Sequence, residues 1–326
     1  MRQRLSSLVV VAALVVATPI FGQATADPET GGGAFLLLPV GARATALGQA
    51  AAADWGSSEV IFWNPAGLAP ADNNEIAVHY ASTFISDNTA LAASISAGRL
   101  GVFGVGAYLV DYGSQDVVGG PGVPIGRISP KNVELLASYA TAVGGGLSMG
   151  VNYKLIQLRQ DCSGQCAAFP SVAGTTHGVD IGLQYAVAGS DALRLGFVVR
   201  HAGFKLQLRN EGQADPLPTR VQVGAIYKVL LPRLRGSDER FDARFLIDVD
   251  DEWGEYSDLD WRIGLDVGLR DLLRFRTGYA FLNSQSRGPS VGVGIRVGKL
   301  AVDLARVFFV SSNFDEPLHV SVRAIL

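Results

Sequence analysis

Apolar side chains alternate with polar or small ones in short stretches between residues 76 and 322. In the first stretch Ile76, Val78 and Tyr80 share one face, while Ala77 and His79 share the other. A period of two is typical of β-strands, because successive side chains of a strand point to opposite faces. Fourteen such stretches occur, at residues 76–80, 91–95, 103–109, 133–139, 147–155, 179–185, 193–199, 221–229, 241–247, 261–267, 273–279, 291–295, 300–304 and 318–322.

The two faces of these predicted strands differ in chemistry. One face is apolar throughout, whereas the other is polar and rich in charge, as at Lys154, Asp180 and Arg244. A β-sandwich in water shows the same alternation. Here, however, the apolar face persists over all fourteen stretches, and closure of the sheet would leave no unpaired edge. The pattern favours an all-β fold, a transmembrane antiparallel β-barrel of about 14 strands, and an even number suits a closed barrel.

Composition supports a wall that faces lipid. The 326 residues include 39 Gly, and only 17% of them are charged. The mean hydropathy is positive at +0.25, although the sequence shows no long apolar helix. A barrel wall in contact with lipid accounts for this apolar content directly. The formal net charge of −3 argues against a nucleic-acid partner.

The connections between the predicted strands alternate in length over the first half of the chain. Long connections are predicted at 82–88, 112–131, 161–175 and 202–219, and short ones at 98–99, 143–145 and 188–192. Outer-membrane barrels combine long outward loops with short periplasmic turns, so both chain ends are expected on the periplasmic side. The stretch 231–240 is an exception, because it is long although it lies on the predicted short side.

The beginning of the chain has the pattern of a secretory signal peptide. Arg2 and Arg4 precede an apolar stretch at residues 8–20, and small residues follow at Ala24 and Ala26. We therefore predict a signal peptide at 1–26, a plug segment at 27–72 and the barrel at 73–326. The predicted location is the cell outer membrane, where outer-membrane lipid surrounds the wall.

The predicted plug segment lacks the alternation of a wall strand. Residues 41–53 are alanine-rich and predict a short helix, and Asn64 before Pro65 suits the start of a second helix. Exposure of Trp63 would be costly, so we expect this segment inside the barrel, where it limits passage. A buried Arg43 would need a partner, for which the candidates are Asp180, Asp248, Asp266 and Asp303.

The plug segment also carries a family resemblance. It resembles the N-terminal signature of the PorV/PorQ family of outer-membrane proteins at Gly41, Arg43, Leu47, Gly48, Asp54, Trp63, Asn64, Pro65, Gly67 and Leu68. The resemblance implies a fourteen-stranded barrel similar to the FadL-type transporters, with the N-terminal segment in the lumen. It also implies binding or passage of cargo at the outer membrane. Some family members serve type IX secretion, so secreted cargo proteins or secretion-system components are the implied partners.

Side chains that could carry other chemistry are few. Cys162 and Cys166 lie in a predicted surface loop, and an exported pair of this kind is expected to form a disulfide. The acidic cluster at residues 248–252 lacks the spacing of a calcium loop and predicts a solvated loop. The sequence contains no recognisable catalytic constellation, so we predict a protein that is not an enzyme and has no cofactor or metal site.

Two alternative functions stay open from the sequence. Uptake of a hydrophobic small molecule, as in FadL-type barrels, requires an apolar path through the lumen, whereas the predicted inner face is rich in arginine. A barrel hydrolase requires a Ser–His pair on one rim, and the sequence indicates no such pair.

Overall fold

The fold was established from a computed structural model that describes residues 33–120, 122–166, 170–187, 192–208, 214–230, 241–254, 256, 259–269, 272–282, 288–309 and 316–326. The predicted signal peptide at 1–26 and the predicted connection at 231–240 lie outside the described residues. Among the described residues, no helix combines the length and the apolar character needed to cross a bilayer.

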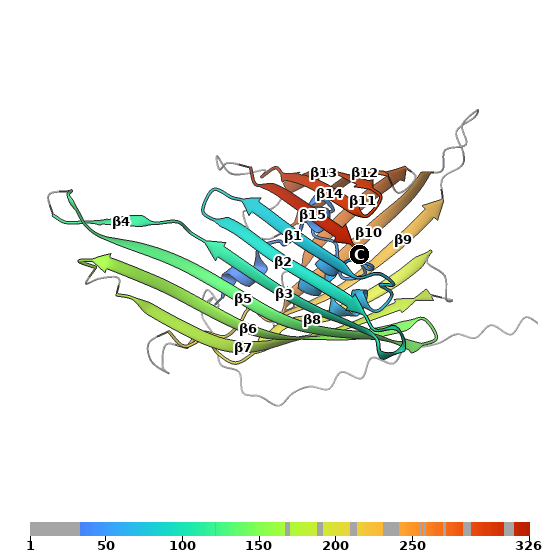
Figure 1. The fold of residues 1–326 in the computed structure, drawn as a ribbon, viewed down its shortest axis with the longest axis horizontal. Helices are drawn as coiled ribbons and strands as arrows, with labels where there is room; N and C mark the ends of the chain where they lie inside the picture. The colour runs from blue at the N-terminus through green and yellow to red at the C-terminus, as the bar shows by residue number, and fades with distance from the viewer. Residues whose placement is uncertain are drawn as a thin grey trace, which may run out of the picture. The chain divides into compact units, whose positions relative to one another are not determined.

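Fourteen antiparallel strands among the described residues form a closed barrel, because β1 pairs with β2 on one side and with β15 on the other (Figure 1). Each predicted stretch lies within one of these strands, so the predicted fold is confirmed. The wall consists of β1 Glu75–Ser82, β2 Asp87–Ser96, β3 Val102–Asp111, β5 Pro124–Gly144, β6 Leu147–Gly164, β7 Val172–Ala186, β8 Leu193–Gly203, β9 Arg220–Leu230, β10 Phe241–Glu252, β11 Asp260–Leu269, β12 Leu273–Phe281, β13 Gly288–Val297, β14 Leu300–Val307 and β15 Leu318–Ile325.

The wall has the two faces that the alternation predicts. Outward residues such as Ile76, Leu91 and Val105 are exposed, whereas their inward neighbours Ala77 and Ala92 are buried. Large apolar side chains on the outside of a closed barrel suit contact with lipid. The buried inner face packs against another part of the chain.

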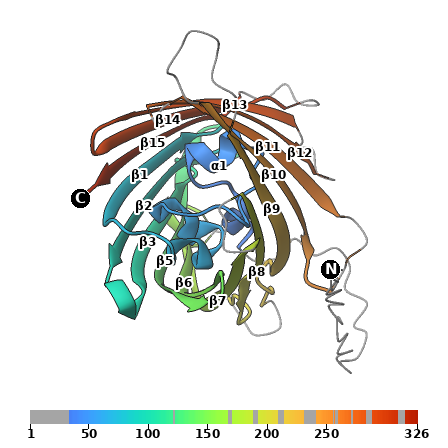
Figure 2. The same cartoon turned by 90° about the vertical axis from the view of Figure 1, so that its right-hand side faces the viewer.

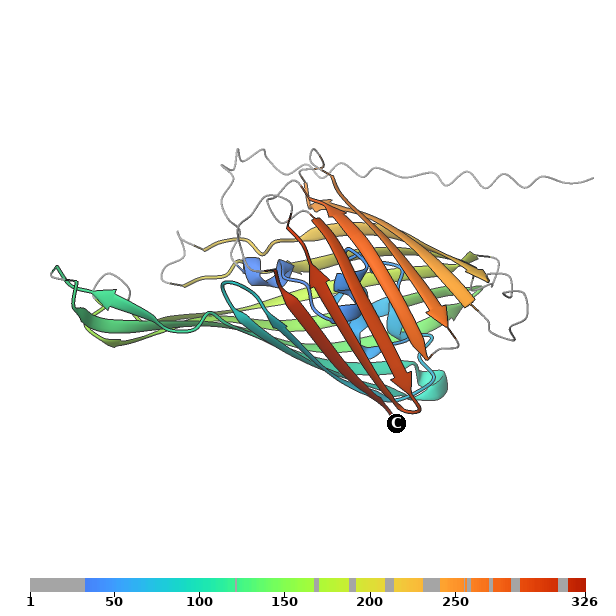
Figure 3. The same cartoon turned by 90° about the horizontal axis from the view of Figure 1, so that it is seen from above.

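Several strands extend beyond the wall and form a projection. Strand β5 has 21 residues and β6 has 18, whereas a membrane-spanning strand needs only ~9–11. The extra length of β5 pairs with β6 and with the short strand β4 (Gln115–Val118), as Figure 3 shows from above. The predicted loops at 112–131 and 161–175 are therefore wrong in part. Outside the membrane the alternation of apolar residues stops, so the pattern that revealed the wall strands is missing there.

The segment before β1 lies inside the barrel and contains four short helical elements. These are the 3₁₀ helices η1 Ala34–Leu37, η2 Ser58–Phe62 and η3 Pro65–Leu68, and the α-helix α1 Ala42–Ala46. Figure 2 shows this segment, in blue, surrounded by the ring of strands. A further 3₁₀ helix, η4 Gly98–Leu100, forms the turn between β2 and β3.

Candidate functional site

The plug segment, residues 33–72 of the described chain, contacts most of the inner wall. Helix α1 contacts β12 to β15, η2 contacts β1 to β3, and η3 contacts β5 to β7. Nearly all of its side chains between residues 40 and 68 are buried. The lumen and the plug segment together form the only extensive buried region among the described residues, so we take them as the candidate site.

Inward-facing glycines of the wall allow the plug segment to approach the strands closely. A Cβ added at Gly278 would overlap the backbone of Leu47 and Gly48, and one at Gly196 would overlap the carbonyl of Ala52. Equivalent close approaches to the backbone of the plug segment occur at Gly150, beside Ala66, and at Gly264, beside Leu47. Such backbone-to-backbone contact is possible only where the wall has no side chain. This accounts for part of the high glycine content.

Buried carboxylates of the wall bind backbone amides of the plug segment. Asp248 of β10 accepts hydrogen bonds from the amides of Ala51 and Ala52, at 2.7 and 2.8 Å. Glu75 of β1 accepts from the amide and the hydroxyl of Ser58, at 2.8 and 2.7 Å. The prediction of a solvated acidic loop at 248–252 is therefore wrong for Asp250 and Asp251, which are buried in β10 as well, and above all for Asp248. That residue lies in a strand and faces the lumen, where it satisfies amides that no helix or sheet would satisfy.

Asn64 and Pro65 begin helix η3, as their types suggest. The Oδ1 atom of Asn64 accepts from the amide of Ala66 at 3.0 Å, and its Nδ2 atom donates to the carbonyl of Ala52 at 2.6 Å. Gly67 lies against the carbonyl of Asp54. These contacts hold residues 64–67 of the plug segment against residues 52–54 of the same segment.

Trp63 is only 4% exposed and lies in the lumen. Its indole Nε1 donates to the carbonyl of Val40 at 2.9 Å, and the Arg200 guanidinium stacks over its ring at 5.3 Å. Leu47 and Leu68 are buried as well. Because its N–H group has an acceptor and its ring has a cationic neighbour, Trp63 is stable in the buried lumen and holds the plug segment there.

Arg43 forms an ion pair within the plug segment itself. Its guanidinium donates to Asp54, which in turn lies 3.6 Å from Arg244 of β10. The predicted partners, all strand residues, are wrong, because a nearer carboxylate follows in the same segment. Burial alone would lower the pKa of Arg43, but Asp54 and Glu59 outweigh it and keep the pKa above its ordinary value.

Glu59 lies beneath helix α1, a contact that the sequence did not indicate. Its Oε1 atom accepts from the amide of Ala44 at 3.0 Å, and its carboxyl group fills the space beside Gly41. Gly41 has a φ of 91° and Gly48 a φ of 64°, which L side chains rarely adopt. Burial raises the pKa of Glu59 to about 7.

Arginines and carboxylates form one network on the inner faces of β10 to β15. Asp266 accepts from Arg244, Arg274 and Arg276, with the latter two at 3.0 and 3.2 Å. Asp303 binds Arg276 at 2.5 Å and Arg323 at 3.0 Å. Each carboxylate therefore satisfies several guanidinium groups, which is the arrangement that buried charges require.

An apolar wall lies elsewhere in the lumen, on β2, β3 and β5. Phe35 of the plug segment stacks on Tyr108 with ring centroids 6.2 Å apart, and Phe62 contacts the same ring edge-on at 6.4 Å. Several inward polar residues among them are small and neutral, as at Ser94 and Ser138, while the buried Glu134 of β5 is paired with Lys154 of β6 at 2.8 Å. We define the apolar wall as Ala90, Ala92, Val102, Tyr108, Val110 and Leu136, all buried.

A Ser–His pair is present in the lumen, although the sequence did not indicate one. Ser321 Oγ lies 2.8 Å from His79 Nδ1, and Glu59 Oε2 lies 3.9 Å from the same nitrogen. Ser321 is fully buried and also accepts from the amide of Ala42 at 2.8 Å. In a nucleophilic triad the carboxylate and the hydroxyl contact different nitrogens of the ring. The pair therefore fits a role in binding the plug segment.

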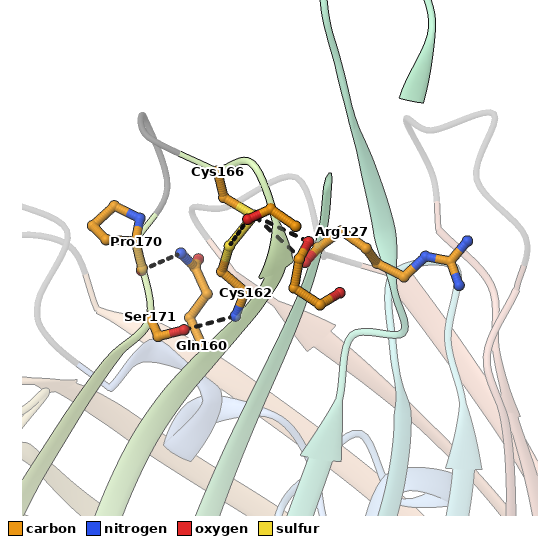
Figure 4. Close-up of a disulfide and its surroundings, with 8 residues drawn as sticks. Arg127, Gln160, Cys162, Cys166, Pro170 and Ser171 are labelled. Carbon is orange, nitrogen blue, oxygen red and sulfur yellow. Dashed lines mark hydrogen bonds between the residues drawn. A yellow bond between two sulfur atoms is a disulfide. The ribbon is translucent and has the colours of Figure 1, made fainter. Parts of the chain in front are cut away.

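Cys162 and Cys166 form a disulfide on the projection, at the end of β6 (Figure 4). The Cys162 amide donates to the Ser171 hydroxyl at 2.8 Å, and Gln160 donates to the Pro170 carbonyl at 3.3 Å. The disulfide lies far in sequence from the plug segment and contributes no residue to the lumen.

No protein-family model matches the chain, and no curated protein matches it in sequence. Solved barrels match it in fold. The toluene transporter TbuX of Ralstonia pickettii is 14% identical with a TM-score of 0.56, over 88% of this chain and 98% of that one. The CymD monoaromatic hydrocarbon channel is 14% identical with a TM-score of 0.59, over 89% and 98%. A Pseudomonas aeruginosa FadL homologue is 13% identical with a TM-score of 0.50, over 88% and 98%. At such identities the likeness concerns the fold, which is that of FadL-type barrels.

Proposed function

We propose that this chain is an outer-membrane channel for hydrophobic small molecules, of the kind that the FadL-like fold accommodates. Among the similar structures, TbuX is a toluene transporter and CymD a monoaromatic hydrocarbon channel. The sequence leaves this function open as an alternative to cargo secretion, and the likeness in fold supports it better than secretion. The PorV/PorQ assignment has no family or sequence match and stays a prediction.

The single observation that carries the proposal is the apolar wall. The predicted inner face is rich in arginine, but most of those arginines are paired with carboxylates on β10 to β15. The inner faces of β2, β3 and β5 instead present Val102, Val110 and Leu136. A hydrocarbon gains ~25 cal/mol for each Å² of apolar surface removed from water, so it would follow this side of the lumen.

The plug segment differs along its length in a way that would allow passage. Residues 41–68 are bound by Asp248, Glu75 and the glycines of the wall. Within residues 33–40, Phe35 stacks on Tyr108 of the wall, and Phe35, Leu36 and Val40 belong to the same buried apolar cluster. Displacement of residues 33–40 would therefore uncover the part of the apolar wall that Phe35 covers at Tyr108, while helices η2 and η3 would keep their contacts with β2, β3 and β5.

Matched substitutions on opposite sides of the barrel test this function. Leu136→Gln places an amide in the apolar wall, and Leu246→Gln makes the same change at an inward, buried residue of β10. We expect Leu136→Gln to slow the uptake of radiolabelled toluene by cells several-fold, and Leu246→Gln to leave it near the wild-type rate. Equal rates in both variants and the wild type, with folded protein in the membrane, would refute the proposed route.

A second candidate function, binding of a secreted protein, rests on the family resemblance and on one observation. The projection of β4 to β7 extends past the wall and exposes Val118 and Ile125. A variant shortened in the projection would then lose a secreted protein that co-purifies with the barrel. Toluene uptake would be unaffected by that change.

A further inference from the structure

A cavity of about 380 Å³ lies in the lumen at the end of the barrel where β1 begins and β15 ends. Its lining includes Trp55 of the plug segment and Glu75 and Ile325 of the wall. Most of its charged lining is cationic. We call it the basic cavity, after Arg43, Lys228, Arg244, Arg274, Arg296 and Arg323 in its lining.

The positive charge of this cavity is only partly balanced. Arg323 lies 3.0 Å from Asp303 and 3.6 Å from Glu75, and Arg274 lies 3.2 Å from Asp242. At the rim, neither Lys228 nor Arg296 forms an ion pair with any described residue, and Arg296 donates only to the Gly298 carbonyl. Asp72 is an exposed carboxylate of the same rim.

Two buried donors of the lining lack an acceptor. The Nε atoms of Arg43 and Arg244 have no hydrogen-bond partner in the described part of the chain, although these residues are only 7% and 8% exposed. Buried polar groups are nearly always paired, and an unpaired donor costs stability. A cavity lined by these two residues, with two rim cations that form no ion pair in the described part of the chain, is suited to a ligand that brings acceptors and negative charge.

We propose that the basic cavity binds a small oxyanion, such as inorganic phosphate or the phosphoryl group of a small organic phosphate. Guanidinium groups present several N–H donors in a fixed plane, which matches the separated oxygens of phosphate. Lys228 and Arg296 at the rim would attract the anion, and Arg43 and Arg244 would bind it deeper. Glu75 of β1 and Ser94 of β2 also line the site, but none of the residues that define the apolar wall does, so the site goes beyond the proposed channel function.

Calorimetric titration of the full purified chain with inorganic phosphate tests this site. The variant Lys228→Gln/Arg296→Gln removes two cations that have no described carboxylate partner, so the paired network is left intact. Lys299→Gln is the matched control, because Lys299 is exposed in the adjacent β13–β14 turn and does not line the cavity. We expect the wild type to bind phosphate, the double variant to bind at least fivefold more weakly, and the control to bind as the wild type does.

A parallel titration with glycerol 3-phosphate distinguishes the source of the phosphoryl group. Tighter binding than that of inorganic phosphate would identify a small organic phosphate as the ligand, and equal affinity would identify the anion alone. Absence of binding by the wild type to both probes would overturn the proposal. An equal loss in Lys299→Gln and the double variant would overturn it too, because the effect would then be one of net charge.

Discussion

Glu59 shows how one buried carboxyl group joins the plug segment to the wall. It accepts from the amide of Ala44 in helix α1 and lies beside His79 of β1. Burial raises its pKa from an ordinary value of 4.5 to about 7, because the ionised form loses its hydration inside the lumen. Protonation therefore favours the folded state.

The first prediction is that stability falls as the pH rises through this range. Below pH 4.5 Glu59 is protonated in both states, and its stabilising contribution, fully present there, is lost as the pH approaches about 7. At ~1.4 kcal/mol for each pH unit between the two pKa values, the loss is on the order of 3 kcal/mol. Urea unfolding at both ends of this range measures it. Glu59→Gln should reduce the pH dependence, and an unchanged dependence in that variant would exclude Glu59 as the cause.

The second prediction concerns the wall glycines. Gly278→Ala should destabilise the barrel by about 1–3 kcal/mol, because the new methyl group meets the backbone of Leu47 and Gly48. Gly120→Ala is the matched control, since a Cβ there meets open space, and it should change stability by less than about 0.5 kcal/mol. Equal free energies of unfolding for the two variants would show that the plug segment is not in close contact with the wall at Gly278.

At the same scale, the sequence could identify residue types but not their partners. Trp63, Asn64 and Pro65 could be assigned from local chemistry, because a helix cap and a costly aromatic side chain are local properties. The contact between His79 and Ser321 joins residues 242 apart in sequence, and no local pattern indicates it. Arg43 and Asp54 are only 11 residues apart, but no helix or strand period relates them, so the sequence does not favour Asp54 over the inward carboxylates of the strands.

Among the elements, strands in lipid were predictable and strands in water were not. In each wall strand one face meets lipid and the other meets the plug segment. Apolar and polar residues therefore alternate with a period of two along the sequence of that strand. The projecting parts of β5 and β6 meet water on the outside, where Arg127 and Asp116 pair at 2.9 Å. Polar residues on both faces, and Pro124 and Pro130 in the strand, remove the signal that the prediction used.

The third prediction concerns the disulfide on the projection. Cys162→Ser/Cys166→Ser should leave the thermal unfolding of the barrel unchanged, because a cross-link across 4 residues closes a short loop outside the wall. Limited proteolysis should instead cut the projection faster. Treatment of the wild type with reductant is the control and should reproduce the effect. A large loss of barrel stability would show that the projection supports the wall.

The whole molecule combines a polar and an apolar side in one lumen. The arginine network on β10 to β15 binds the plug segment through Asp54, and the apolar wall on β2, β3 and β5 contacts Phe35 and helices η2 and η3. A list of inward residues from the sequence mixes these two sides, because the order along the chain does not show which strands lie opposite each other. The closed topology separates them, and this separation is what makes a hydrophobic route compatible with many inward arginines.

The most direct test of this account fixes residues 33–40 on the apolar wall. Phe35→Cys/Tyr108→Cys places thiols where two rings now stack with centroids 6.2 Å apart, and the two native cysteines are already joined in a disulfide. A short bifunctional thiol reagent should join the new pair and reduce toluene uptake by cells to the background rate. The single variant Phe35→Cys, treated in the same way, should keep its rate. Undiminished uptake through the cross-linked barrel would contradict the account.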